Sequence, residues 1–254
     1  MMDPSRLVLL VTGATSGFGE AVARRFIAAG ARVIGTGRRA DRLDALAAEL
    51  GDRFLPLTFD VTDRPATDAA LASLTGPWAE IDVLVNNAGL AMGLEPAWQV
   101  DMADWDVMIA TNCTALAYMT RKVLPGMVAR GRGHVVNLSS VAATRPYPGG
   151  NVYGATKAFV SQLSDNLRAD LIGHPIRVTA IEPGLCQTEF SLVRFKGDAA
   201  RAEAPYRGVQ PLSADDVAET VWWAVTLPAH ININRMEVMP VMQAFGPFVI
   251  HREG

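Results

Sequence analysis

The sequence is poor in the residues that build disulfide frameworks and metal sites. It has two cysteines and four histidines in 254 residues. Cys113 and Cys186 cannot form a disulfide framework, and no group of cysteines and histidines has the spacing of a zinc site. We therefore expect a reducing, cytoplasmic environment and no bound metal.

A strong charge of one sign and long apolar runs are also missing. The formal net charge is −3, without a large acidic or basic block, which disfavours nucleic acid as a partner. No apolar run approaches the ~18 residues of a membrane span, so we expect no membrane partner. The apolar residues 7–11 are too few for the core of a signal peptide.

What the sequence does contain is a large apolar fraction in an alternating pattern. Half of the residues are apolar, enough for a sizeable core in one domain spanning residues 1–254. Alternation of this kind predicts an α/β, single-domain Rossmann fold: a parallel seven-stranded sheet with helices on both faces. Strands are expected at residues 7–11, 31–36, 54–59, 81–85, 135–138, 176–181 and 231–239. Helices are expected at residues 20–29, 43–50, 64–74, 104–129, 151–172 and 213–227.

Two segments fall outside this alternation. Residues 185–208 are less regular, and we expect them to close over a substrate as a lid. The tail, residues 240–254, carries several apolar side chains that a monomer gains little by exposing. We expect this tail to form a subunit contact.

A glycine-rich turn follows the first expected strand. Gly13, Gly17 and Gly19 lie between this strand and a helical pattern. Glycines let the backbone approach a pyrophosphate, and the helix presents free N–H groups to it. The G-x-x-x-G-x-G spacing differs from the usual G-x-G-x-x-G, and a plain strand-to-helix turn is the alternative. The strand–turn–helix context favours a dinucleotide site.

The ends of the second and third strands indicate which dinucleotide is bound. An NAD site usually has an acid at the end of the second strand, whereas this chain has Arg38 and Arg39. Guanidinium groups suit a 2′-phosphate and predict NADP, although one of the two can equally be a solvated loop residue. Asp60 ends the third strand, where its carboxylate can accept from an adenine amino group. Alternatively, Asp60 or Thr62 caps the following helix.

Three amides occupy unusual positions. Asn86 and Asn87 follow the fourth strand, where an amide can satisfy backbone groups of adjoining strands or contact a ribose. We expect one of the two to be mainly structural. Asn112 lies inside a long helical pattern, where its short amide competes with the backbone for hydrogen bonds.

The chemistry is expected around Tyr153 and Lys157. Four residues apart on a helix, the two side chains lie on one face. A nearby ammonium favours the phenolate and lowers the pKa of the tyrosine from its usual value near ~10. Ser140, at the end of the fifth strand, can converge with Tyr153 on one substrate oxygen. An ordinary packing pair within a helix is the alternative for Tyr153 and Lys157.

Taken together, these motifs resemble those of the classical short-chain dehydrogenase/reductases over essentially the whole chain. The motifs are Thr12-Gly13-x-x-x-Gly17-x-Gly19, Asn86-Asn87-Ala88-Gly89, Asn112, Ser140, Tyr153-x-x-x-Lys157 and Pro183-Gly184. Residues 11–20, 149–160, 193–198 and 227–234 are further similar to the bacterial NADP-dependent 3-hydroxy acid dehydrogenases. That group oxidises L-allo-threonine, serine and 3-hydroxyisobutyrate and reduces malonic semialdehyde.

The resemblance implies a role for each motif residue. Tyr153 would be the acid/base, and Lys157 would lower its pKa and hold the nicotinamide ribose. Ser140 and Tyr153 would bind the substrate oxygen, while Asn112 would bend its helix and hold a water beside Lys157. The family is usually tetrameric, which agrees with the apolar tail. The implied NADP contacts are Gly13, Ala14, Thr15, Ser16, Gly17, Phe18, Arg38, Arg39, Asp60, Val61, Asn87, Tyr153, Lys157, Pro183, Gly184 and Thr188.

Two departures from the family pattern concern the substrate. Cys186-Gln187 replaces an expected glycine-rich step before Thr188, and Arg145 stands in the loop beside Tyr153. Arg145 or Arg194 can bind a substrate carboxylate, or each can be a solvated lid residue.

The hypothesis is therefore interconversion of short 3-hydroxy acids and their semialdehydes or 3-oxo acids. The candidate acids are serine, L-allo-threonine, 3-hydroxyisobutyrate and 3-hydroxypropionate. A broad-specificity ketone or aldehyde reductase is the first alternative, and a non-catalytic NADP-binding regulator is the second.

Overall fold

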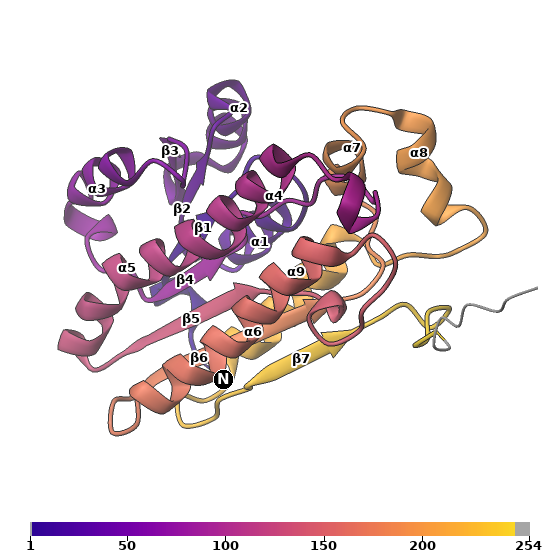
Figure 1. Ribbon diagram of the computed structural model, residues 1–254. Helices are drawn as coiled ribbons and strands as arrows, with labels where there is room; N and C mark the ends of the chain where they lie inside the picture. Colours follow the sequence, from indigo (N-terminus) through magenta and orange to yellow (C-terminus); the bar gives the residue numbers. More distant parts are fainter. Residues whose placement is uncertain (1, 247–254) are drawn as a thin grey trace, which may run out of the picture.

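The computed structural model describes residues 2–246, and within them seven parallel strands form one sheet (Figure 1). Their order is β3-β2-β1-β4-β5-β6-β7. The chain therefore builds outward from β1 to β3, then returns to the other side of β1 to place β4. This reversal is the switch point of a doubly wound sheet, and the seven parallel strands confirm the predicted Rossmann fold. The strands are β1 (Val8–Thr12), β2 (Arg32–Gly37), β3 (Phe54–Thr58), β4 (Val83–Asn86), β5 (Gly133–Leu138), β6 (Ile176–Pro183) and β7 (Arg235–Val238).

Helices cover both faces of the sheet, because alternate side chains of each central strand point to opposite sides. Leu9 of β1 packs in one core with Phe26 and Val221. Leu10 packs in the other core with Met119. Figure 1 shows α5 and α6 on one face and α1 and α9 on the other. The helices are α1 (Gly17–Ala28), α2 (Ala40–Leu50), α3 (Arg64–Ala72), α4 (Met102–Ile109), α5 (Leu116–Arg130), α6 (Asn151–Asp170), α7 (Phe190–Arg194), α8 (Ala199–Glu203) and α9 (Ala214–Thr226).

Two expected elements differ from the structure. The long helix expected at 104–129 is α4 and α5 joined by a π-helical segment, Ala110–Ala115. The last strand, expected at 231–239, is only Arg235–Val238. It starts late because Ile231 closes a turn onto Pro228. Asn232 then bonds the backbone N–H and carbonyl of Val178 through its side chain, at 2.7 and 2.9 Å, in place of ladder bonds.

The expected lid and tail are described in part. Residues 185–208 contain the short helices α7 and α8, connected by irregular chain. The tail is described to residue 246, with Val241 fully exposed. Among residues 2–246, none of the helices is long and apolar enough to cross a membrane. The tail residues Phe248, Val249 and Ile250 lie outside the described residues.

Candidate active site

The predicted site residues gather at the carboxyl edge of the sheet, where parallel strands present ligand-binding loops. Most of the predicted cofactor residues line a cleft of ≈ 320 Å³ that runs along the ends of β1 to β5. Ala14 does not line it, because its side chain is fully buried in the core under β1. Pro183 and Gly184 line an adjoining, larger cavity. The predicted cofactor residues that line the cleft are Gly13, Thr15, Ser16, Gly17, Phe18, Arg38, Arg39, Asp60, Val61, Asn87, Tyr153, Lys157 and Thr188.

The glycine-rich turn is shaped by close backbone approaches. Gly13 and Gly17 have φ of +70° and +56°, a region that side chains disfavour. A Cβ on Gly19 would stand 2.3 Å from the Gly13 carbonyl oxygen. The turn therefore depends on glycine at these positions, and α1 begins at its end with free N–H groups facing the cleft.

The two amides after β4 have different surroundings. Asn86 is buried and donates to Thr120 Oγ1 at 2.9 Å and to Asn137 Oδ1 at 2.8 Å, so it joins β4 to its neighbours. Asn87 donates to the carbonyls of Thr12 and Gly13 at 2.8 and 3.0 Å, and it lines the cleft. The expectation that one of the pair is mainly structural is confirmed for Asn86.

Arg38 lies exposed at the end of β2, where an NAD site would have an acid. Its side chain is 70% exposed, and its ion pair with Asp60 is 3.6 Å long. The other carboxylate oxygen of Asp60 accepts from the backbone and hydroxyl of Thr62. Asp63 caps α3, so the capping alternative for Asp60 or Thr62 is wrong. The available guanidinium suits a phosphate on the adenosine ribose.

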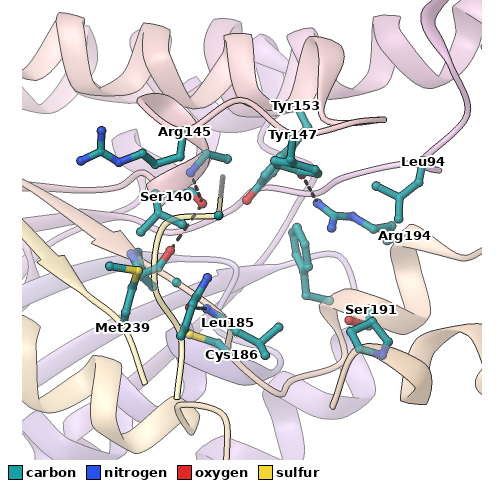
Figure 2. A pocket seen from close by; sticks show the side chains of 18 of the residues that line it. Leu94, Ser140, Arg145, Tyr147, Tyr153, Leu185, Cys186, Ser191, Arg194 and Met239 are labelled. Carbon is teal, nitrogen blue, oxygen red and sulfur yellow. Dashed lines mark hydrogen bonds between the residues drawn. The ribbon is translucent and has the colours of Figure 1, made fainter. Parts of the chain in front are cut away.

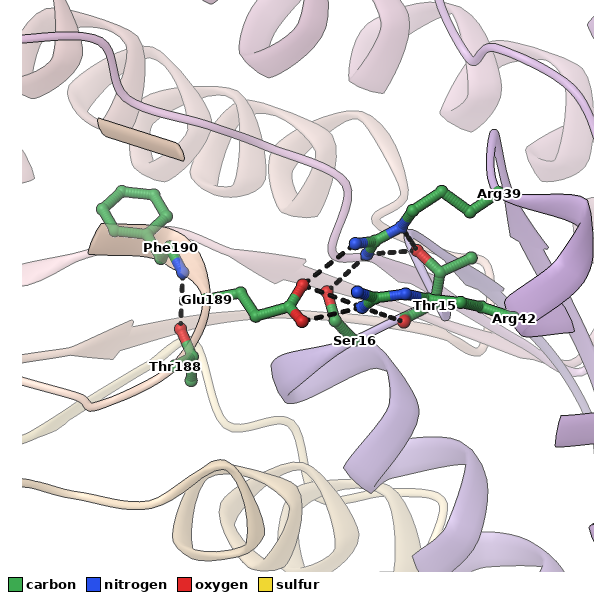
Figure 3. A network of polar contacts seen from close by, with 7 residues as sticks. All are labelled: Thr15, Ser16, Arg39, Arg42, Thr188, Glu189 and Phe190. Atoms are coloured by element: carbon green, nitrogen blue, oxygen red, sulfur yellow. Dashed lines mark hydrogen bonds and ion pairs between the residues drawn. The ribbon is translucent and has the colours of Figure 1, made fainter. Parts of the chain in front are cut away.

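Arg39 belongs to a polar network that the sequence analysis did not predict (Figure 3). It donates to Thr15 Oγ1 at 2.7 Å and to Ser16 Oγ at 2.8 Å. Arg39 and Arg42 both bond the carboxylate of Glu189, at 2.9 and 2.7 Å. Arg42 lies three residues after Arg39 at the start of α2, a spacing that places both on one helix face. That spacing was the signal available in the sequence.

Tyr153 and Lys157 lie one turn apart on α6, as predicted. The Lys157 ammonium is 5.8 Å from the Tyr153 ring centre and donates to the Leu138 carbonyl at 2.8 Å. Ser140 follows β5, and its hydroxyl accepts from the Ala142 N–H at 3.1 Å. The three side chains meet where the cleft joins the larger cavity.

The pKa values differ from the sequence-based expectation. Burial of the Tyr153 hydroxyl raises its pKa to about 12, although Arg194 and a hydrogen bond from Ser140 act in the lowering direction. Burial also lowers the pKa of Lys157 to about 8. The expected lowering of the Tyr153 pKa by Lys157 is therefore wrong for the free protein, in which Arg194 and Ser140 are the groups that act to lower it. At neutral pH Tyr153 is a phenol, the proton-donating form.

Asn112 lies within the π-helical segment, which agrees with the implied bend. Its Oδ1 accepts from the Leu90 N–H at 2.9 Å. Its Nδ2 donates to the Leu90 carbonyl at 2.8 Å and to Thr156 Oγ1 at 3.0 Å. Asn112 thus ties the loop after β4 to α6 next to Lys157.

The larger cavity, ≈ 1060 Å³, separates the two candidate arginines (Figure 2). The Arg194 guanidinium lies 5.0 Å from the ring centre of Tyr153 and donates to the Tyr147 hydroxyl at 3.3 Å. Its Nε is buried without a hydrogen-bond partner. Arg145 is exposed and stacks on the ring of Phe245 at 3.8 Å. Only Arg194, of these two, places a cation over the tyrosine.

The segment that departs from the family pattern is anchored to the chain before α9. Tyr206 donates to the Cys186 carbonyl at 2.9 Å, and the Gln187 N–H donates to the Leu212 carbonyl at 2.9 Å. Burial raises the pKa of the Cys186 thiol to about 12. Cys186 is therefore poorly suited to act as a nucleophile. Within the described residues, no group of three or more His, Cys, Asp or Glu side chains is arranged to hold a metal ion.

Comparison with known proteins gives matches over nearly the full length. Residues 7–197 match the family described as short chain dehydrogenase. NADP-dependent 3-hydroxy acid dehydrogenase YdfG of Salmonella typhi is 57% identical over 247 residues, covering 97% of this chain and 100% of that protein. Serine 3-dehydrogenase of Agrobacterium fabrum is 56% identical over 245 residues, covering 96% and 98%. The solved closed form of a serine dehydrogenase complexed with NADP+ has a TM-score of 0.96 at 56% identity, covering 97% and 100%.

Proposed function

The chain belongs to the short-chain dehydrogenase family, and from this premise we propose that it interconverts short 3-hydroxy acids and their semialdehydes or 3-oxo acids. It is an NADP-dependent oxidoreductase that acts on CH–OH groups. The exposed Arg38 at the end of β2 and the glycine cradle under α1 fit this cofactor. The proposed substrates are serine, L-allo-threonine, 3-hydroxyisobutyrate and 3-hydroxypropionate.

One observation carries the choice of a carboxylate-bearing substrate. Arg194 holds its guanidinium 5.0 Å from the Tyr153 ring, with a buried Nε that has no partner. A donor of this kind gains when it pairs with an anion. The reacting hydroxyl of a 3-hydroxy acid and its carboxylate are separated by a short carbon chain. Such a molecule can reach both Tyr153 and Arg194.

The roles of the reacting residues follow from their positions. In oxidation, Tyr153 as phenolate accepts the substrate hydroxyl proton, and in reduction it returns this proton to the carbonyl oxygen. Ser140 hydrogen-bonds the same oxygen and orients it. Lys157, held on the Leu138 carbonyl, places a cation near Tyr153, and it would hold the nicotinamide ribose. When bound, NADP supplies the hydride chemistry, and these residues position and polarise the substrate.

A substrate panel tests the proposal. The reduction of NADP+ is followed with the four hydroxy acids and with 2-propanol, beside the reverse reaction with a semialdehyde. We expect turnover of the hydroxy acids and little turnover of 2-propanol. Turnover of uncharged alcohols alone contradicts the proposal.

The volume of the cavity favours one second candidate. At ≈ 1060 Å³ and with many apolar lining residues, the cavity is far larger than serine requires. Its size suits a broad-specificity reductase of ketones and aldehydes. Bulky uncharged ketones separate the two functions. A broad-specificity reductase acts on them with a higher kcat/KM than on the short acids, whereas a 3-hydroxy acid dehydrogenase does not.

The exposed apolar side chains after β7 support the expected homotetramer. Val241 is fully exposed, Met242 is 63% exposed and Phe245 is 50% exposed. Clustered apolar exposure of this kind favours a subunit contact. Light scattering measures the mass of the particle directly, and a monomer contradicts this part of the proposal.

A further inference from the structure

A carboxylate of the lid bridges to the opposite rim of the cofactor cleft (Figure 3). Glu189 directly precedes α7, and its oxygens bond Arg39 at 2.9 Å and Arg42 at 2.7 and 2.9 Å. These arginines stand at the start of α2, about 150 residues earlier in the chain. The cleft runs between the two rims, and residues of both line it. The ion pairs therefore join the lid to the rim of the glycine-rich turn.

Arg39 is committed to this network, whereas Arg38 is not. Arg39 divides its donors among Glu189 and the hydroxyls of Thr15 and Ser16. Arg38 keeps a 70% exposed side chain with one long ion pair. The neighbouring arginines thus have different tasks. Arg38 remains available to a phosphate, and Arg39 holds the two rims together.

The bridge acts on the whole of α7, since this helix is only one turn long. Glu189 precedes its first residue, and Arg194 is its last. Between them, the Phe190 ring lies 5.7 Å from that of Tyr153. The position of Glu189 therefore contributes to where Phe190 and Arg194 lie over the tyrosine.

We propose that Glu189 and Arg42 are positioning residues: they form a latch that holds α7 across the cofactor cleft and keeps Arg194 facing Tyr153. Neither residue contacts the reacting atoms, and both act through α7. The part of this proposal that concerns the substrate rests on the proposed function. The part that concerns the lid depends only on the fold and is measured on the free protein.

The first test measures lid opening without cofactor or substrate. Lys196 and Arg201 have exposed side chains within the lid and are cleavable by trypsin when it opens. We expect Glu189→Gln to raise the cleavage rate about three- to tenfold, the range for losing two partly exposed ion pairs. We expect Arg42→Gln to raise the cleavage rate as well. In the double variant the increase is smaller than the product of the two single increases, because both substitutions break the same ion pair. Glu49→Gln, which breaks an exposed pair with Arg24 elsewhere, leaves the rate unchanged.

The second test separates a latch from a competing anion. If Glu189 forms the latch, calorimetry shows that Glu189→Gln weakens the binding of NADP+ and of NAD+ by a similar factor. It also raises KM for a hydroxy acid more than it lowers kcat. Unchanged lid cleavage together with tighter NADP+ binding in Glu189→Gln overturns the latch, because Glu189 then competes with the 2′-phosphate. Faster lid cleavage supports the latch even if the protein oxidises no hydroxy acid, so the proposed function can fail separately.

Discussion

Replacing Arg194 with methionine tests the carboxylate site by removing the guanidinium while keeping an unbranched side chain. The guanidinium lies over the rings of Tyr153 and Phe190, each 5.0 Å away. Methionine retains apolar contact with both rings but removes the charge and the unpartnered Nε. We expect the variant to fold and to bind NADP+ normally, while losing its preference for hydroxy acids.

The size of the effect follows from the environment of the guanidinium. A carboxylate ~4 Å from a cation gains about 1 kcal/mol in water and about 4 kcal/mol at an effective dielectric constant of ~20. Arg194 is part-buried, so we take an intermediate value of about 2 kcal/mol for its interaction with the substrate carboxylate. That corresponds to about a 30-fold loss in kcat/KM. Arg194 also acts to lower the pKa of Tyr153, so its removal slows oxidation of every substrate. This loss is common to all substrates, so it cancels when kcat/KM for the hydroxy acid is divided by kcat/KM for the neutral alcohol.

The assay therefore compares kcat/KM for 3-hydroxyisobutyrate with that for a neutral secondary alcohol of similar size. Arg145→Met is the matched control, because this arginine lies in the same cavity but stacks on Phe245. We expect the ratio to fall about 30-fold in Arg194→Met and to stay within about twofold in Arg145→Met. An unchanged ratio in Arg194→Met, or a fall only in Arg145→Met, refutes the assignment.

Four further predictions concern the site and the core. Tyr153→Phe lowers kcat about 10²- to 10⁴-fold; full activity in this variant contradicts acid–base catalysis. Because the pKa of Tyr153 is raised to about 12 and only the phenolate accepts a proton, oxidation kcat/KM rises about tenfold per pH unit near neutrality, and a flat profile opposes this role. Arg38→Gln weakens NADP+ at least about tenfold and leaves NAD+ unaffected, as measured by calorimetry; equal losses for both argue against phosphate binding. Phe26→Ala, at a fully buried position beside Trp222, lowers the free energy of unfolding by about 3–5 kcal/mol in urea titration, and a loss below about 1 kcal/mol contradicts the packing.

Most of the fold could be predicted because it depends on local patterns. Apolar strands followed by turn residues and amphipathic helices indicate a parallel α/β sheet. The glycines at 13, 17 and 19 mark a turn of restricted backbone geometry, which the structure confirms. The start of β7 could not be predicted, since the Asn232 side chain replaces strand bonds through a contact with the distant Val178.

The sequence by itself determined which side chains meet at the proposed site. Tyr153 and Lys157 must share a helix face at their spacing, and Ser140 must follow a strand that ends beside them. These relations need only the periodicity of a helix and the direction of a parallel sheet. The structure places all three together at the carboxyl edge of the sheet, where the cleft meets the cavity.

Only the tertiary structure decided the pKa values of these groups and which arginine lies over Tyr153. Burial, which no local pattern reports, gives Tyr153 and Lys157 pKa values of about 12 and 8. Arg145 and Arg194 are equivalent in sequence terms, yet packing places only Arg194 over the tyrosine. The bridge from Glu189 to the start of α2 joins residues that are distant in the chain. Such features arise because side-chain partners and desolvation depend on segments that folding brings together.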